Sequence, residues 1–136
     1  MSADVLEKFA AKARLEPLDA LAAEPEAVDD FTAFGFLRGV RDRALYLELR
    51  QKNGNLTALG YAWIERIEFD PSIGITLHAL GQQIVIRGRN LNGEMRPGVR
   101  LVQGLTRQRV PWIQEADEPT AFQTPAHGVL VERIEL

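Results

Sequence analysis

The chain has 136 residues, a net charge of −3 and no cysteine. This length predicts a single domain, residues 1–136, whose core is large enough to fold without disulfides or metals, and the lack of cysteine excludes thiolate nucleophiles and zinc–thiolate sites. No apolar stretch has the length of a signal-peptide core or a membrane span, so we expect a cytoplasmic protein with no membrane partner.

Charge is distributed unevenly along the chain. Residues 35–52 carry five basic and two acidic side chains, and residues 87–109 carry six basic and one acidic. Residues 1–34 and 110–136 are both acidic. Two interpretations stay open: the acidic ends neutralise the basic middle, within one fold or across a subunit contact, or the middle forms a basic surface for an anionic ligand.

Residues 1–30 predict a helical N-terminal segment. Leu6, Phe9 and Ala13 recur on one helical face, and Ser2 or Asp4 can cap the helix start. Three phenylalanines then follow between residues 31 and 36. We interpret them as core anchors for a first strand.

Residues 31–91 predict a β-barrel core. Leucines alternate with polar residues in 45–50, which is typical of a strand with one buried face. Asn53-Gly54 favours a type I′ hairpin turn, and the long return strand 56–69 is expected to bend at Gly60.

Further strands are predicted at residues 73–80 and 83–87, after a turn at Asp70-Pro71-Ser72. The connections are too short for parallel crossovers, so these strands form an antiparallel meander. The fold class is therefore mainly β, and we expect the meander to close into a small bent antiparallel barrel, SH3- or Sm-like, which removes its edges.

Residues 92–136 predict a C-terminal helix-strand extension. A helix is expected at 99–108, although Gly104 weakens it, an acidic surface loop at 115–125, and a final strand at 128–136. The final strand contains ERIEL, an echo of ERIEF at 65–69. We interpret the echo as two similar strands.

Catalytic sets with diagnostic spacing are missing from the sequence. A small enzyme or sensor would use His78 or His127 with Asp70 or Glu115 in a pocket at the barrel end, but no such pair has a characteristic spacing. The chain has no P-loop and no dinucleotide-binding motif. We therefore predict a non-enzymatic protein without a cofactor.

An acidic cluster near the C-terminus is the one candidate for a metal. Glu115, Asp117 and Glu118 could together hold a hard cation. Beside Pro119 they favour a solvated loop instead. We predict no metal site.

Residues 84–91 read IVIRGRNL, which resembles the second signature of Sm-like (Lsm) proteins, an apolar strand ending in Ile-Arg-Gly-x-Asn. The resemblance extends over residues 45–91, although the first signature is too long here. It implies a helix before a bent barrel, a homo-oligomeric ring and single-stranded RNA bound by the loops. Arg87, Gly88 and Asn90 occupy the positions of that signature.

The same residues suggest an anion site without the resemblance. Arg87 and Arg89 flank Gly88 at a strand end, where arginine can hold a phosphate bidentately and glycine admits a ligand to the backbone. The alternative is that both arginines pair with the acidic ends of the chain.

The sequence as a whole favours a binding or assembly module. We expect a homo-oligomer that binds RNA or another polyanion through Arg87, Gly88, Arg89 and Asn90. A small-ligand sensor or small enzyme is the alternative.

Overall fold

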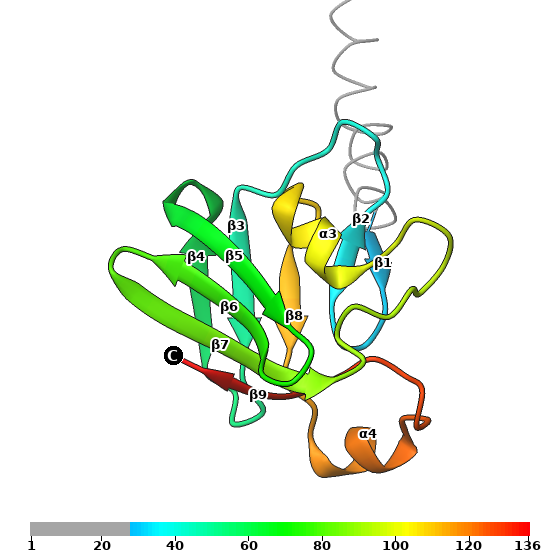
Figure 1. Ribbon diagram of the computed structural model, residues 1–136. Helices are drawn as coiled ribbons and strands as arrows, with labels where there is room; N and C mark the ends of the chain where they lie inside the picture. The colour runs from blue at the N-terminus through cyan, green and yellow to red at the C-terminus, as the bar shows by residue number, and fades with distance from the viewer. Residues whose placement is uncertain (1–27) are drawn as a thin grey trace, which may run out of the picture.

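The computed structural model of the protein describes residues 28–136. The predicted helical segment, residues 1–30, lies outside the described residues except for residues 28–30, where a strand is found in place of a helix. The described part is mainly β, as predicted, with short helices (Figure 1). Its elements are β1 (Val28–Asp30), β2 (Gly35–Leu37), β3 (Tyr46–Arg50), β4 (Leu56–Gly60), η2 (Tyr61–Trp63), β5 (Ile64–Asp70), β6 (Gly74–Ala79), β7 (Gln82–Arg89), α3 (Leu101–Thr106), β8 (Trp112–Gln114), α4 (Glu118–Gln123) and β9 (Leu130–Glu135).

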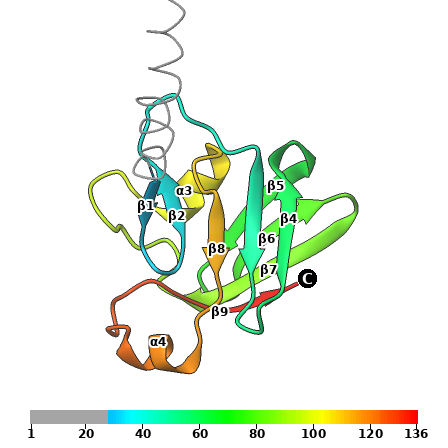
Figure 2. The ribbon, with the colours of Figure 1, turned by 180° about the vertical axis from the view of Figure 1, so that it is seen from behind.

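The strands form three sheets. β1 and β2 make a hairpin, β4-β3-β8 make a second sheet, and β5-β6-β7-β9 make the third. The predicted meander β5-β6-β7 and the hairpin around Asn53-Gly54 are confirmed. The predicted type I′ turn is wrong, because the loop spans residues 51–55 and Gly54 has a positive φ but Asn53 does not. β8 pairs with β3 in parallel and β9 pairs with β7, so residues beyond 91 complete both larger sheets (Figure 2).

The predicted bend at Gly60 is confirmed, and it carries the chain from one sheet to the other. β4 ends at Gly60 in the three-stranded sheet, η2 turns the chain, and β5 begins the four-stranded sheet. One apolar cluster lies between the sheets. Its fully buried side chains are Phe34, Leu47, Leu49, Ile75, Leu77, Ile86, Leu101, Leu105, Val110, Ile113, Val131 and Ile134.

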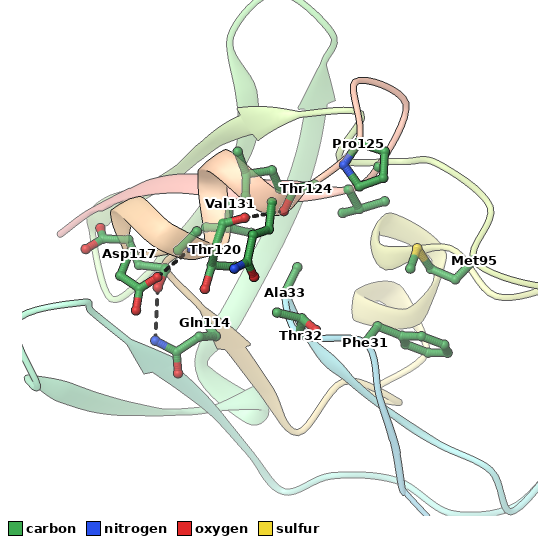
Figure 3. A pocket seen from close by; sticks show the side chains of 16 residues that line it. Phe31, Thr32, Ala33, Met95, Gln114, Asp117, Thr120, Thr124, Pro125 and Val131 are labelled. Carbon is green, nitrogen blue, oxygen red and sulfur yellow. Dashed lines mark hydrogen bonds between the residues drawn. The ribbon is translucent and has the colours of Figure 1, made fainter.

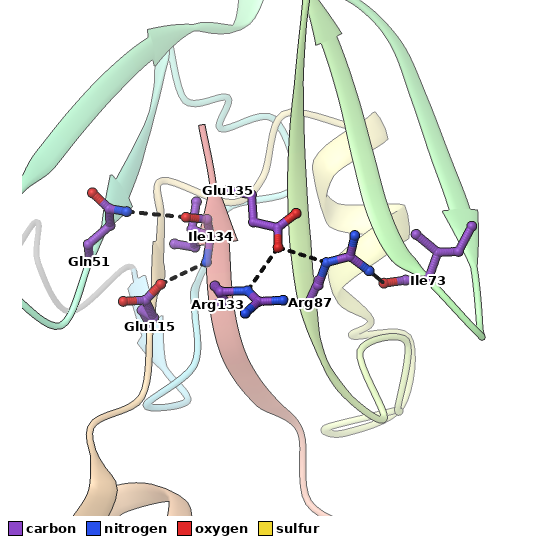
Figure 4. Close-up of polar contacts among 7 residues, drawn as sticks. All are labelled: Gln51, Ile73, Arg87, Glu115, Arg133, Ile134 and Glu135. Carbon is purple, nitrogen blue, oxygen red and sulfur yellow. Dashed lines mark hydrogen bonds and ion pairs between the residues drawn. The ribbon is translucent and has the colours of Figure 1, made fainter.

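The prediction of a closed barrel is wrong, because side chains take the place of a strand ladder between β9 and the three-stranded sheet. The buried carboxylate of Glu115 accepts hydrogen bonds from Lys52 N at 3.0 Å and Ile134 N at 2.7 Å. Gln51 Nε2 donates to Ile134 O at 3.2 Å (Figure 4). One backbone bond, from Ala116 N to Val131 O at 2.8 Å, completes this junction. We call it the Glu115 junction.

The predicted surface loop at 115–125 is also wrong in two respects. Glu115 is buried, and residues 118–123 form α4. Asp117 caps this helix by accepting a hydrogen bond from Thr120 N at 2.9 Å, and Pro119 occupies the first turn, where its missing N–H costs nothing. Acidic residues beside a proline can thus start a helix as well as form a loop.

The helix predicted at 99–108 is confirmed, although it is shorter (α3), and its glycine has a packing role. A Cβ on Gly104 would lie 2.7 Å from Phe36 Cε2 and 2.8 Å from Val110 Cγ2. Only a residue without a side chain allows α3 to lie this close to β2. The packing therefore outweighs the poor helix propensity of glycine.

We expect E115A to lower the free energy of unfolding by about 2–3 kcal/mol, because two backbone N–H groups lose a charged acceptor. Urea unfolding followed by circular dichroism measures this. Glu65 is exposed and its side chain makes no hydrogen bond or ion pair with a described residue, so E65A should stay within about 0.5 kcal/mol of wild type. An E115A protein of wild-type stability would show that other contacts hold the two sheets together.

We expect G104A to destabilise the protein by about 1–3 kcal/mol through overpacking against Phe36 and Val110. A gain in helix propensity of about 1 kcal/mol opposes this and does not cancel it. Gln103 is exposed in the same helix, and Q103A should be neutral or slightly stabilising in the same unfolding experiment. Stabilisation by G104A would contradict the packing argument.

Candidate functional site: an arginine cavity

Five arginines line one cavity of about 510 Å³ between β2, α3 and the loops beside them. We call it the arginine cavity; its charged lining is Arg38, Arg43, Arg96, Arg107 and Arg109. The rest of the lining is apolar or glycine. The cavity is therefore strongly cationic.

Backbone hydrogen bonds bring the two basic segments of the sequence together at this cavity. Leu37 N donates to Arg109 O at 2.8 Å, and Ala44 N donates to Gln108 O at 2.7 Å. These bonds place the link between β2 and β3 alongside the link between α3 and β8. Residues 35–52 and 87–109 thus supply one surface.

Arg109 forms the floor of the cavity. Its guanidinium donates to Val40 O at 3.1 Å and to Leu37 O, and it lies over the Phe36 ring with 5.2 Å to the ring centroid. Its Nε is buried and has no partner in the described part of the chain. Arg109 fixes the loop after β2, and its buried Nε is left without an acceptor in this part of the chain.

Asp29 positions two further arginines. This buried carboxylate on β1 accepts hydrogen bonds from Arg38 Nε at 2.7 Å and from Arg96 Nη2. The Arg38 side chain remains 56% exposed and that of Arg96 49%. One carboxylate shared by two guanidinium groups leaves a net positive charge and further N–H donors facing solvent.

The last two arginines have the freest guanidinium groups. Arg107 is exposed and has no hydrogen bond or ion pair from its side chain to any described residue, and Arg43 uses only Nη1, for Val40 O and Asp42 O. Guanidinium groups recognise phosphate and carboxylate through paired N–H donors. The cavity can bind an anion, and none of its lining side chains is a nucleophile or general base.

Arg87, one of the four residues predicted to bind an anion, pairs with Glu135 on β9. Its Nε donates to Glu135 Oε2 at 3.0 Å, and Arg133 Nε binds the same oxygen at 2.8 Å (Figure 4). The hydrogen bond from Arg87, followed by the charges of both arginines, holds the pKa of Glu135 below its usual value. The interpretation that basic residues pair with the acidic ends is confirmed for Arg87. Arg89 pairs with no described residue.

Gly88 and Asn90 have structural contacts. A Cβ on Gly88 would lie 1.9 Å from Leu130 O, so glycine is needed for the approach of β7 and β9. Asn90 has φ of 53° and donates from its amide to Ala126 O and Gly128 O at 2.9 and 3.0 Å. These contacts anchor β9, and a ligand role for the four residues stays a prediction.

The candidate catalytic pairs do not assemble. His78 Nε2 lies 2.6 Å from Glu68 Oε1 on the outer face of the four-stranded sheet, and this bond is the main cause of the lowered pKa of Glu68. Asp70 accepts two hydrogen bonds from Ser72, which lower its pKa. Glu115 accepts the backbone hydrogen bonds of the Glu115 junction. His127 is exposed in a turn.

The metal candidate is likewise not assembled. Glu115 points into the junction between the sheets, and Asp117 caps α4. Among residues 28–136 no group of three or more His, Asp or Glu side chains could hold a metal ion.

A second cavity, of about 470 Å³, lies beneath α4 (Figure 3). Its walls include Phe31, Met95 and Val131, with Thr120 and Gln114 among its polar groups. No arginine or lysine lines it. Glu115 and Asp117 add two carboxylates to the lining, so a polyanion would find repulsion and no cation there.

Comparisons with protein families, curated proteins and solved structures find no match to this chain. No helix among the described residues is long and apolar enough to cross a bilayer.

Sequence reasoning missed the arginine cavity although its signal was present. The two basic segments contain all five lining arginines. Their convergence depends on the pairing of residues 37 and 44 with residues 109 and 108, which no local pattern indicates.

We expect R87A to raise the pKa of Glu135 toward the ordinary glutamate value, because its first hydrogen-bond donor is lost. Carbon NMR titration of the carboxyl measures this. A carboxyl group whose pKa is lowered in the folded state stabilises the fold at pH values above its ordinary pKa. This stabilisation is lost as the pH falls through the folded-state pKa. R87A should therefore weaken the acid dependence of stability in that window, whereas R66A, next to Glu68, should leave Glu135 unchanged.

Proposed function

We propose that this protein is a non-enzymatic binding module whose ligand is RNA or another polyanion. The observation that carries this proposal is the gathering of five arginines around one cavity. Like charges placed close together repel one another, and a bound anion relieves that repulsion. The cavity offers free guanidinium donors and no catalytic side chain, which favours binding over chemistry.

The proposal differs from the loop-site prediction in where the anion binds. Arg43 and Arg107 have free donors at the cavity, while Arg87 is committed to Glu135. Self-association into a homo-oligomer, which the Sm-like resemblance implies, stays a prediction. It is independent of the cavity.

We expect R43A/R107A to weaken the binding of single-stranded RNA and of inorganic polyphosphate at least tenfold at low salt. The slope of log K against log salt should fall by about one for each arginine that contacts a phosphate. Fluorescence anisotropy over a salt series measures both quantities. R87A/R89A removes the same charge from the loop and is the matched control, with a smaller expected loss.

A larger loss in R87A/R89A than in R43A/R107A would overturn the proposed site in favour of the predicted loop. If the wild-type protein binds neither ligand, the proposed function is wrong. The cavity beneath α4 would then favour the alternative, a small-ligand sensor.

A further inference from the structure

Two aromatic side chains are exposed side by side at the corner where β4 turns into β5. Tyr46 is 58% exposed and Trp63 is 56% exposed. Both adjoin Gly60, since a Cβ there would lie 2.8 Å from Trp63 Cδ1 and 3.7 Å from Tyr46 Cε2. We call Tyr46 and Trp63 the aromatic pair.

The aromatic pair lies at the same end of the molecule as the arginine cavity. The start of β3, η2 and the link from α3 to β8 lie together at the upper end in both ribbon views (Figures 1 and 2). The bonds Ala44 N to Gln108 O and Tyr61 N to Leu45 O, at 2.7 and 2.9 Å, join these segments. The segments that carry the arginines and the aromatic pair are therefore neighbours at this end of the molecule.

The short stretch of chain between Arg43 and Tyr46 limits how far apart the cavity and the aromatic pair can lie. Arg43 precedes Tyr46 by three residues, which span at most about 10 Å of extended chain. Stacked nucleotides advance by about 3.4 Å each along a strand. A short single strand can thus reach from the cavity to the aromatic pair.

We infer that the ligand is a single-stranded nucleic acid, with phosphates in the arginine cavity and unpaired bases stacked on Tyr46 and Trp63. This inference rests on the proposed function and adds the class of polyanion. A polyanion without bases would use the arginines alone. Aromatic faces beside a cationic groove accept any base, because every base has a π-face, and a duplex keeps its bases stacked inside.

The two tryptophans of the chain allow a direct test. Trp112 is partly buried, with its ring centroid 4.7 Å from the guanidinium carbon of Arg50. The full-length W112F protein keeps Trp63 as its single tryptophan, so its tryptophan fluorescence reports on Trp63. We expect oligouridylate or oligothymidylate to quench this fluorescence, and inorganic polyphosphate to bind without quenching it. Comparison of the affinities for the RNA and DNA oligomers shows which of the two nucleic acids the protein prefers.

The affinity of variants separates stacking from charge. Y46A and W63A should each weaken oligonucleotide binding about tenfold, the loss typical of one stacked base, and leave polyphosphate binding unchanged. F122A is the matched control, because Phe122 is 92% exposed on α4, away from this surface. It should change neither affinity.

Several outcomes would overturn the inference. Equal binding of duplex and single strand, unquenched Trp63, or wild-type oligonucleotide affinity in both Y46A and W63A would show that bases are not stacked there, while polyphosphate binding would still uphold the anion module. Loss of a dimer in sedimentation velocity on W63A would instead assign the aromatic pair to a contact between copies. If neither ligand binds wild type, the proposed function fails as well.

Discussion

The hydrogen bonds of Glu115 determine how the two larger sheets meet. Its carboxylate binds Lys52 N at the end of β3 and Ile134 N on β9, where a barrel would have a ladder between strands. A buried carboxylate is costly unless donors satisfy it, and here both donors are backbone groups that also need an acceptor. The parallel ladder between β8 and β3 places the links that carry the arginines, and the Glu115 junction holds β9 of the other sheet against these strands.

The arginine cavity shows how the fold holds like charges together. Arg109 is attached to two carbonyls and the Phe36 ring, and Asp29 neutralises part of the charge of Arg38 and Arg96. These contacts use only some of the guanidinium donors. Core packing, including the close approach at Gly104, positions the scaffold, and the repulsion that remains is what an anion would relieve.

Two surfaces of the protein carry arginines but differ in the balance between arginines and carboxylates. On the outer face of the four-stranded sheet, the echoed segments form the edge strands β5 and β9, and each pairs its own arginine and glutamate at 3.1 and 2.8 Å. The interpretation of the echo as two similar strands agrees with this placement. At the arginine cavity, five arginines line the surface, and no Asp or Glu among the described residues does. That difference in balance is why we assign binding to the second surface.

The sequence by itself determined the strands, the hairpin at Asn53-Gly54, the bend at Gly60 and the helix near Leu101, because each depends on periodicity or on backbone preferences of nearby residues. It also indicated that the middle of the chain is basic. Only the tertiary structure decided that Glu115 is buried, that Gly104 is a packing residue and that Arg87 faces Glu135. Contacts such as that between Ala44 and Gln108 join residues distant in sequence. Which arginines share a cavity depends on such long-range pairing, and local patterns carry no information about it.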